Sequence, residues 1–314
     1  MADEGNPDKA LQTVGSRPEA ESFELEAIVV TAGKRKDAVS DIPAHVTVIT
    51  SEDISAYAGT GITELLARES GITVRSTFGN DKQAVLDLRG MGDTAASNVI
   101  IMVDGLVLNS PDQSGASLSS VPLEQIERIE IVRGAGSVVY GSGAVGGVIN
   151  IITKKSDGSP SAQIYGSYGT YDTFENRVSL DAGIRDVAVN LNAGWHDSDG
   201  YRDNGFFRKK DVSAATGCLL ADRVSVTVFG SFYEDDYGLP GPVGRADISD
   251  SGRRRHTDYP EDEGETTEAK ARLELDMDLE KWGSISLKRG FCFGRTTISL
   301  ATPPDFPQQP EGQN

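Results

Sequence analysis

Hydrophobic and polar positions follow two different periods along this chain. Between Ile42 and Lys155, short β-rich runs are separated by turn residues and by two segments with a helical period. From Ser161 onward, longer segments such as RVSLDAG, VAVNLNAGWH and RVSVTVFGSFYED alternate apolar and polar residues at period two. The pattern therefore predicts an α+β domain followed by antiparallel strands joined as hairpins.

The first unit is expected to contain strands, two helices and tight turns. A strand is predicted at 45–50, and Ser51 is expected to cap a helix with Asp53 in its first turn. A second helix is predicted at 61–69, where the apolar residues are three and four positions apart. Further strands are predicted at 84–90, 99–108 and 126–134, and a last one in GGVINIITKK, after the glycine-rich turn YGSGAVGG.

The second unit has connections of alternating length. They are short at 169–172, very short at 185–186, longer at 197–207, very short at 222–223 and long at 236–266. Short turns at one end and long loops at the other are typical of bacterial outer-membrane barrels. The strands alone also allow a soluble β-sandwich, although a sandwich would show a less regular asymmetry.

Composition and charge narrow the function. The chain has 314 residues and a net charge of −18, which argues against a nucleic-acid partner because phosphate binding needs a basic surface. Its two cysteines, Cys218 and Cys292, are too few for a disulfide scaffold. YGSGAVGG lacks the Lys-Ser/Thr ending of a phosphate-binding loop and precedes a strand. No acid–base pair, nucleophile triad or metal-ligand spacing indicates an enzyme.

Six motifs occur in register in the first unit: IPAHVTVITSEDI, LARESGITV, LDLRGMG, NVIIMVDG, IERIEIVRG and YGSGAVGGVINIITKK. Together they resemble the plug domain of TonB-dependent outer-membrane receptors. The resemblance implies an α+β plug domain followed by the N-terminal antiparallel strands of an incomplete transmembrane β-barrel, in the outer membrane of a Gram-negative bacterium. The expected domains are an N-terminal segment at 1–40, the plug at 41–155, a partial barrel of six or seven strands at 160–288, and a proline-rich tail at 289–314.

The segment EAIVVTA resembles the TonB box of this family and lies where the family places it. It comprises Glu26, Ala27, Ile28, Val29, Val30, Thr31 and Ala32. The resemblance implies that the segment adds as a strand to TonB, which works with the ExbB/ExbD energising complex. From the pattern alone, EAIVVTA could also be an edge strand of the plug.

The resemblance also implies roles for residues of the plug. Ligand contacts are expected in two apical loops, at Arg75, Phe78, Asn80, Asn109, Asp112 and Gln113. Arg89 and Arg133 are expected to contact glutamates of the barrel wall. The extracellular ligand is expected to be a ferric siderophore or cobalamin, and no cofactor is implied. The segment DSDGYRDN, 197–204, has a slight likeness to a calcium loop, but a polar hairpin loop is the preferred interpretation.

The end of the chain departs from the expected barrel. Pro303, Pro304, Pro307 and Pro310 are incompatible with a barrel strand, and barrels of this family have about 22 strands. We therefore expect a truncated or frame-shifted product whose altered frame begins near Lys288, and no signal peptide is visible at the start. The leading hypothesis is a receptor that imports a scarce nutrient complex. The alternative is a non-transporting fragment or a soluble plug-like binding protein.

Overall fold

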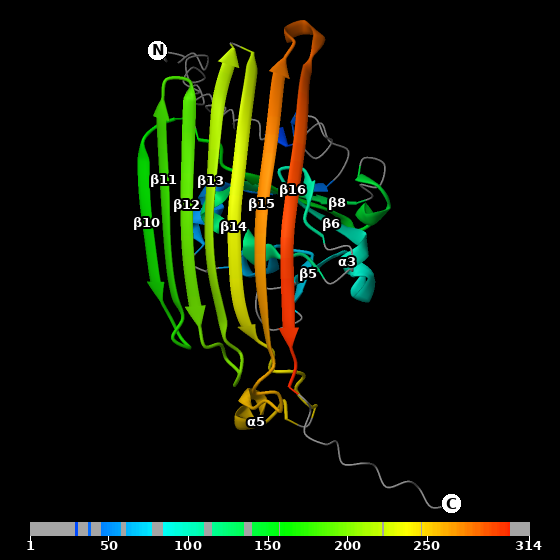
Figure 1. Cartoon of the computed structure of the whole chain (residues 1–314). Coiled ribbons are helices and arrows are strands. Elements are labelled where there is room, and N and C mark those ends of the chain that lie inside the picture. Colours follow the sequence, from blue (N-terminus) through cyan, green and yellow to red (C-terminus); the bar gives the residue numbers. More distant parts are fainter. Residues whose placement is uncertain are drawn as a thin grey trace, which may run out of the picture.

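The chain folds into an α+β domain that lies against one face of a long antiparallel sheet (Figure 1). The computed structural model describes residues 29–30, 37–38, 45–57, 61–76, 84–109, 115–134, 140–156, 158–221, 223–245 and 247–301. Within these residues, no helix is long and apolar enough to cross a membrane.

The α+β domain is built on a five-stranded mixed sheet in the order β3-β8-β9-β6-β7, with β4 and β5 as a separate antiparallel pair. Only β6 and β9 are parallel. The strands are β3 His45–Ile49, β4 Ile72–Ser76, β5 Ala84–Leu88, β6 Val99–Val103, β7 Leu106–Val107, β8 Ile126–Arg133 and β9 Gly147–Thr153. The helices are α1 Ser51–Ala56, α2 Ile62–Ala67 and α3 Ala95–Asn98, with single 3₁₀ turns η3 Gly92–Thr94, η4 Leu118–Ser120, η5 Leu123–Gln125 and η6 Ser142–Ala144.

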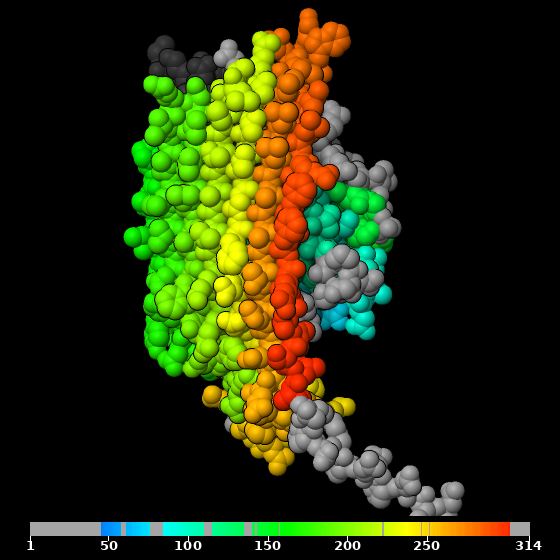
Figure 2. All heavy atoms as spheres, in the orientation of Figure 1, coloured from blue at the N-terminus to red at the C-terminus, as the bar shows by residue number. Residues whose placement is uncertain are grey.

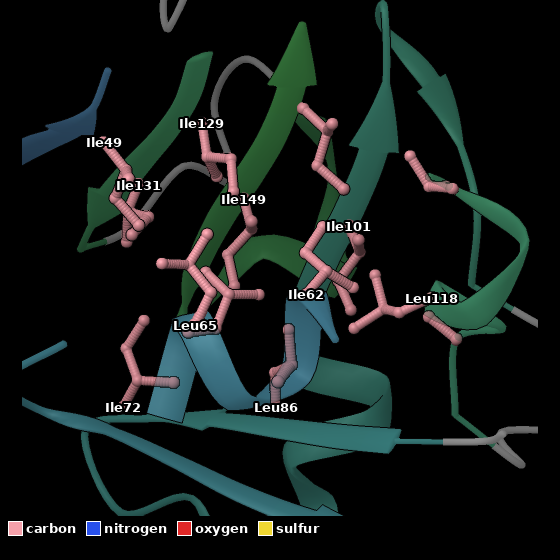
Figure 3. Packing of buried hydrophobic residues seen from close by; sticks show 14 of the residues in the cluster. Ile49, Ile62, Leu65, Ile72, Leu86, Ile101, Leu118, Ile129, Ile131 and Ile149 are labelled. Atoms are coloured by element: carbon pink, nitrogen blue, oxygen red, sulfur yellow. The ribbon is translucent and has the colours of Figure 1, made fainter. Parts of the chain in front are cut away.

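The core of this domain is aliphatic and lies between the sheet and the two longer helices (Figure 3). Ile129, Ile131 and Ile149 extend from the sheet and meet Leu65 of α2, and all four are buried. The predicted helices are confirmed, but the cap of α1 is Thr50 and not Ser51. The Thr50 hydroxyl accepts a hydrogen bond from the Asp53 amide, and the Asp53 carboxylate accepts one from the Thr50 amide.

The long sheet contains seven strands in sequence order, each antiparallel to the next. They are β10 Ser161–Tyr168, β11 Phe174–Ile184, β12 Val187–Ser198, β13 Phe207–Ala221, β14 Val224–Gly238, β15 Glu263–Asp278 and β16 Ser284–Ser299. Apolar side chains such as Leu191, Val212 and Phe232 are exposed on the face that points away from the α+β domain, which is the face seen in Figure 2. The opposite face is polar, and the domain covers part of it along β11 to β15, so the period-two pattern is confirmed.

Connections of different length lie at opposite ends of this sheet (Figure 1). The strands are joined at one end by residues 185–186, 222–223 and 279–283, and at the other by residues 169–173, 199–206 and 239–262. The longest connection carries helix α5 Ser251–Arg255. The predicted alternation of short turns and long loops is therefore present.

The expected tail at 289–314 is wrong for its first part. Strand β16 continues past Lys288 to Ser299 and pairs with β15 along its whole length. Phe291 and Phe293 are exposed on the same face as Arg289 and Arg295, while Gly290 and Gly294 occupy the alternate positions, where small residues obscure the period in the sequence. The expected tail residues 302–314, including all four prolines, lie outside the described residues.

Candidate functional site

The contact between the α+β domain and the seven-stranded sheet is polar and largely buried. Carboxylates, hydroxyls and an amide of the domain meet arginine, lysine, tyrosine and serine side chains of the sheet. A polar contact of this kind can exchange its hydrogen bonds with water, whereas an aliphatic contact would expose apolar surface on separation. The interface is therefore suited to a domain that must move relative to the sheet.

Asp104 is the centre of one buried cluster at this interface. It occupies the two-residue turn between β6 and β7, where Asp104 and Gly105 have φ angles of 50° and 84°. Its carboxylate accepts hydrogen bonds from the Thr153 amide at 2.9 Å and the Thr153 hydroxyl at 2.7 Å. It also forms an ion pair with Arg272 of β15. The Arg272 guanidinium lies over the Phe229 ring, 4.9 Å from its centroid.

A second cluster lies beside the first and joins the end of the domain to two strands. Lys155 Nζ is 2.9 Å from a carboxylate oxygen of Glu274, and Lys288 Nζ is 3.1 Å from the same oxygen. Lys288 also donates a longer hydrogen bond to the Asp104 carbonyl at 3.4 Å. Partial burial lowers the pKa of Lys155, but the hydrogen bond and charge of Glu274 outweigh it, so the net pKa is raised. Lys155 therefore stays charged at neutral pH.

A third cluster connects η5 to the other side of the sheet. Arg177 of β11 pairs with Glu124 of η5 and also with Glu175 of its own strand. The next residue of the domain, Gln125, donates a hydrogen bond to the Ser213 hydroxyl of β13. A cavity of about 280 Å³ lies here between domain and sheet, and its walls include Tyr57, Glu124, Tyr165, Arg177, Asn192 and Asp211.

Two serines of η4 complete the contacts between these clusters. The Tyr233 hydroxyl lies 2.9 Å from the Ser119 hydroxyl and 2.5 Å from Asp235, and all three residues are buried. Lys270 Nζ donates to the Ser120 hydroxyl at 2.8 Å. Within residues 118–125, Ser119 and Ser120 thus contact β14 and β15, and Glu124 and Gln125 contact β11 and β13.

Arg89 and Arg133 lie against other parts of the α+β domain, and their predicted contacts with barrel glutamates stay a prediction. Arg133 donates to the Thr47 hydroxyl and to the Ser70 carbonyl at 2.7 Å, and it lies 3.2 Å from His45 Nδ1. All these partners belong to the α+β domain. The Arg89 guanidinium lies beside Gly134 of the same domain. At the two arginine pairs of the described interface the domain supplies the carboxylate and the sheet the arginine, whereas at Lys155 the domain supplies the cation and Glu274 of the sheet the carboxylate.

The predicted ligand residues are only partly described. Phe78, Asn80, Asp112 and Gln113 lie outside the described residues. Arg75 is partly exposed and pairs with Asp93 at 3.0 Å, so it stays a candidate for ligand contact. The Asn109 side-chain oxygen accepts a hydrogen bond from the Ile101 backbone amide at 2.7 Å, and its side-chain nitrogen donates to the Val99 carbonyl at 2.9 Å. These bonds hold the loop to β6, and the predicted ligand contact of Asn109 stays a prediction.

Only part of the predicted TonB box is described. Its two central residues form β1 Val29–Val30, which pairs with β2 Asp37–Ala38 in an antiparallel ladder. The remaining residues of Glu26 to Ala32 lie outside the described residues.

The segment 197–204 belongs to a pair of interlocked loops. Asn204 donates to the Tyr259 carbonyl at 2.8 Å and to the Asp262 carbonyl at 2.7 Å. Arg202 donates to the His256 carbonyl at 3.0 Å and to the Gly241 carbonyl. Across the described residues, no group of three or more His, Cys, Asp or Glu side chains has the arrangement of a metal site. These contacts are those of a polar hairpin loop that packs against its neighbour.

Sequence reasoning missed Asp104, Glu124, Arg177 and Arg272. Asp104 could have been recognised from the sequence, since Asp-Gly between two apolar runs predicts a tight hairpin whose aspartate points outward. Arg177 and Arg272 each interrupt a strand at a position that the period assigns to the covered face. A charged residue on a buried face indicates a charged partner opposite, although the sequence alone does not identify that partner.

The comparison with known families and proteins identifies the α+β domain. The family model of the TonB-dependent receptor plug domain matches residues 38–148. The vitamin B12 transporter BtuB of Photobacterium profundum is 28% identical over 242 residues, which cover 70% of this chain and 38% of that protein.

Solved structures share the whole arrangement of domain and sheet. The ferripyoverdine receptor of Pseudomonas aeruginosa has a TM-score of 0.72 at 16% identity, covering 89% of this chain and 38% of that one. The ferric yersiniabactin uptake receptor FyuA from Yersinia pestis has a TM-score of 0.71 at 19% identity, covering 82% of this chain and 42% of that one. At these identities the likeness shows the fold alone.

This chain spans 38% of the length of the BtuB relative. The matched parts are the plug domain and the strands that follow it, so the seven-stranded sheet is part of a barrel wall and its apolar face is the membrane face. The α+β domain therefore matches the plug domain of TonB-dependent receptors, and the domain with its seven-stranded sheet is similar to outer-membrane transport receptors that carry this plug.

Proposed function

We propose that the whole protein imports a scarce nutrient complex across the outer membrane, with energy supplied through TonB. The observation that carries the proposal is the buried polar interface between plug and barrel, centred on Asp104, Glu124, Arg177 and Arg272. Such an interface holds the plug in place at rest and can be rehydrated when the plug moves. Ligand would bind on the side of the long loops, and Arg75 is the described plug residue that remains a candidate contact.

Two ligand classes are consistent with this proposal. A ferric siderophore is the general expectation for a receptor of this family. Cobalamin is favoured by a specific observation, the 28% identity to a vitamin B12 transporter over 242 residues. An uptake assay separates the two classes. Cells that carry the whole receptor are given radiolabelled cobalamin or a radiolabelled ferric siderophore, and we expect energy-dependent uptake of the true ligand alone.

Energy coupling is tested at Val30, the last residue of β1. In the whole receptor, Val30→Pro removes a backbone N–H and fixes φ, so a strand at this position loses a hydrogen bond to its partner. We expect import to be abolished while ligand binding to energy-depleted cells is unchanged. The matched control is Val30→Thr, which keeps the N–H and the β-branched shape. Equal uptake by the proline variant and the parent would remove EAIVVTA as the coupling segment.

A further inference from the structure

The central residues of the predicted TonB box are already part of a small sheet. Val29 lies opposite Ala38 and Val30 opposite Asp37, so β1 and β2 form an antiparallel pair. No other strand among the described residues joins this pair. A strand at the edge of a sheet presents unpaired backbone N–H and C=O groups. The edge of β1 that faces away from β2 is therefore open to one further strand.

Pairing with β2 holds β1 extended before a partner arrives. Binding as a strand costs conformational entropy, and a segment that is already extended loses less of it. A pair of strands is at best marginally stable alone in water, so a third strand would also stabilise the pair. A partner strand needs only one edge of β1. Displacing β2 would therefore break the β1–β2 hydrogen bonds without offering the partner an edge that it lacks.

The position of β2 in the chain links this pair to the plug. Ala38, the last residue of β2, is the first residue that matches the plug family. The next strand, β3, begins at His45 and pairs with β8 of the plug sheet. The chain thus runs from β1 through β2 into the plug, and a pull on β1 reaches the plug sheet through β2.

We propose that TonB adds its strand to the edge of β1 opposite β2, so that the complex contains a three-stranded sheet in the order β2, β1, TonB. The β2 strand stays paired in the complex and positions the coupling segment. The inference rests on the proposed coupling through TonB. It concerns which edge of β1 is used, so a binding assay separates its failure from the failure of the coupling.

The edge is tested by bridging β1 to β2 in the whole receptor. In a background with Cys218→Ser and Cys292→Ser, Val29→Cys is joined to Ala38→Cys by a disulfide. Directly opposed residues of antiparallel strands have Cα atoms within the range that a disulfide spans. The measurement is the affinity of the purified receptor for the soluble periplasmic domain of TonB. We expect the bridged and the reduced receptor to agree within about twofold, because β2 does not have to leave.

A bridged receptor that binds TonB about tenfold more weakly than its reduced form would overturn the proposal, because β2 would then have to be displaced. The second register pair, Val30→Cys with Asp37→Cys, is bridged in a parallel receptor, so that the result does not depend on one pair. If the cysteine-free parent and the reduced receptors all fail to bind TonB, the proposed coupling fails and the inference fails with it.

The positioning role of β2 is tested by removing its backbone donors. The double variant Asp37→Pro with Ala38→Pro has no N–H at either residue of β2. We expect its affinity for the periplasmic domain of TonB to fall about fivefold, because β1 must then be ordered at the moment of binding. Asp37→Thr with Ala38→Val, which keeps both donors and favours a strand, is the matched control. An equal loss in this control, or no loss in the proline variant, would overturn the positioning role.

Discussion

Asp104 both forms a tight turn and supplies the carboxylate of a buried ion pair. Its φ of 50° is one that aspartate and asparagine adopt more readily than other non-glycine residues, so it can form the turn between β6 and β7. The same turn points its carboxylate at Thr153 and Arg272. The local backbone thus orients the charged group before the barrel wall contacts it.

We expect Asp104→Asn to destabilise the plug by about 3–5 kcal/mol, because it keeps the turn and the shape of the side chain but leaves Arg272 buried without a counter-ion. The measurement is the free energy of plug unfolding from urea titration of the detergent-folded chain. Asp93→Asn is the matched control, since the Asp93 side chain is fully exposed in its pair with Arg75, and little change is expected there. Equal stability of the two variants would contradict the role of the buried pair.

The residues of this interface were only partly predictable from sequence. Motif likeness directed attention to Arg89 and Arg133, whose partners depend on how β3 and β8 are paired, 88 residues apart at His45 and Arg133. Arg177 and Arg272 were visible as charges on a face with a polar pattern. Their partners in the plug could not be predicted, because the residues of a strand do not specify which domain will cover that strand.

At the level of elements, β9 is placed by one glycine. Gly147 has a φ of 152°, and an added Cβ would lie 2.5 Å from the Val132 carbonyl oxygen and 2.7 Å from Leu88 Cδ1. The strand begins at this position and lies between β8 and β6 in the centre of the sheet. The close approach of three strands therefore requires that no side chain be present.

We expect Gly147→Ala to destabilise the plug by about 1–3 kcal/mol, since the obstructing atom is a backbone oxygen that cannot turn away. Gly143→Ala is the control, because its nearest neighbour would be Ile100 Cγ1 at an ordinary 3.4 Å. Urea titration of both variants compares them directly. A Gly147→Ala plug as stable as the control would mean that β8 and β9 can shift apart without cost.

Most elements could be predicted from the sequence, and the exception has a clear cause. Each predicted plug strand exists. The strand predicted at 99–108 is divided into β6 and β7 by the turn at Asp104 and Gly105. Strand β16 was missed beyond Lys288 because Gly290, Cys292 and Gly294 occupy the positions that alternate with Phe291 and Phe293, and a period-two pattern is hard to detect when one face carries small residues. In the structure, the pairing of β16 with β15 identifies this part of β16 as a strand.

At the level of the whole molecule, the two long loops at one end of the barrel wall form a single unit. Asn204 bridges them by donating to the carbonyls of Tyr259 and Asp262. Behind it, Phe207, Tyr237 and Leu239 form a small buried cluster. The exposed arginines of α5, Arg253 to Arg255, are held within this unit.

We expect Asn204→Ala to accelerate tryptic cleavage at Arg253–Arg255 severalfold, because two carbonyls lose their donor and alanine is strained at a φ of 53°. Asn176→Ala, on the membrane face of β11, is the control in the same detergent. Cleavage products are followed by mass spectrometry. Unchanged cleavage in the Asn204 variant would show that the loops do not depend on each other.

The pairing of β3 with β8 also has a consequence for biosynthesis. His45 lies opposite Arg133, and β3 is an edge strand whose neighbour in the sheet is β8. The first strand of the plug therefore has no partner until residue 133 has been synthesised, and contacts so distant in sequence form slowly. A nascent chain in this condition remains open enough to be threaded through a secretion pore, and it depends on chaperones until its later strands arrive.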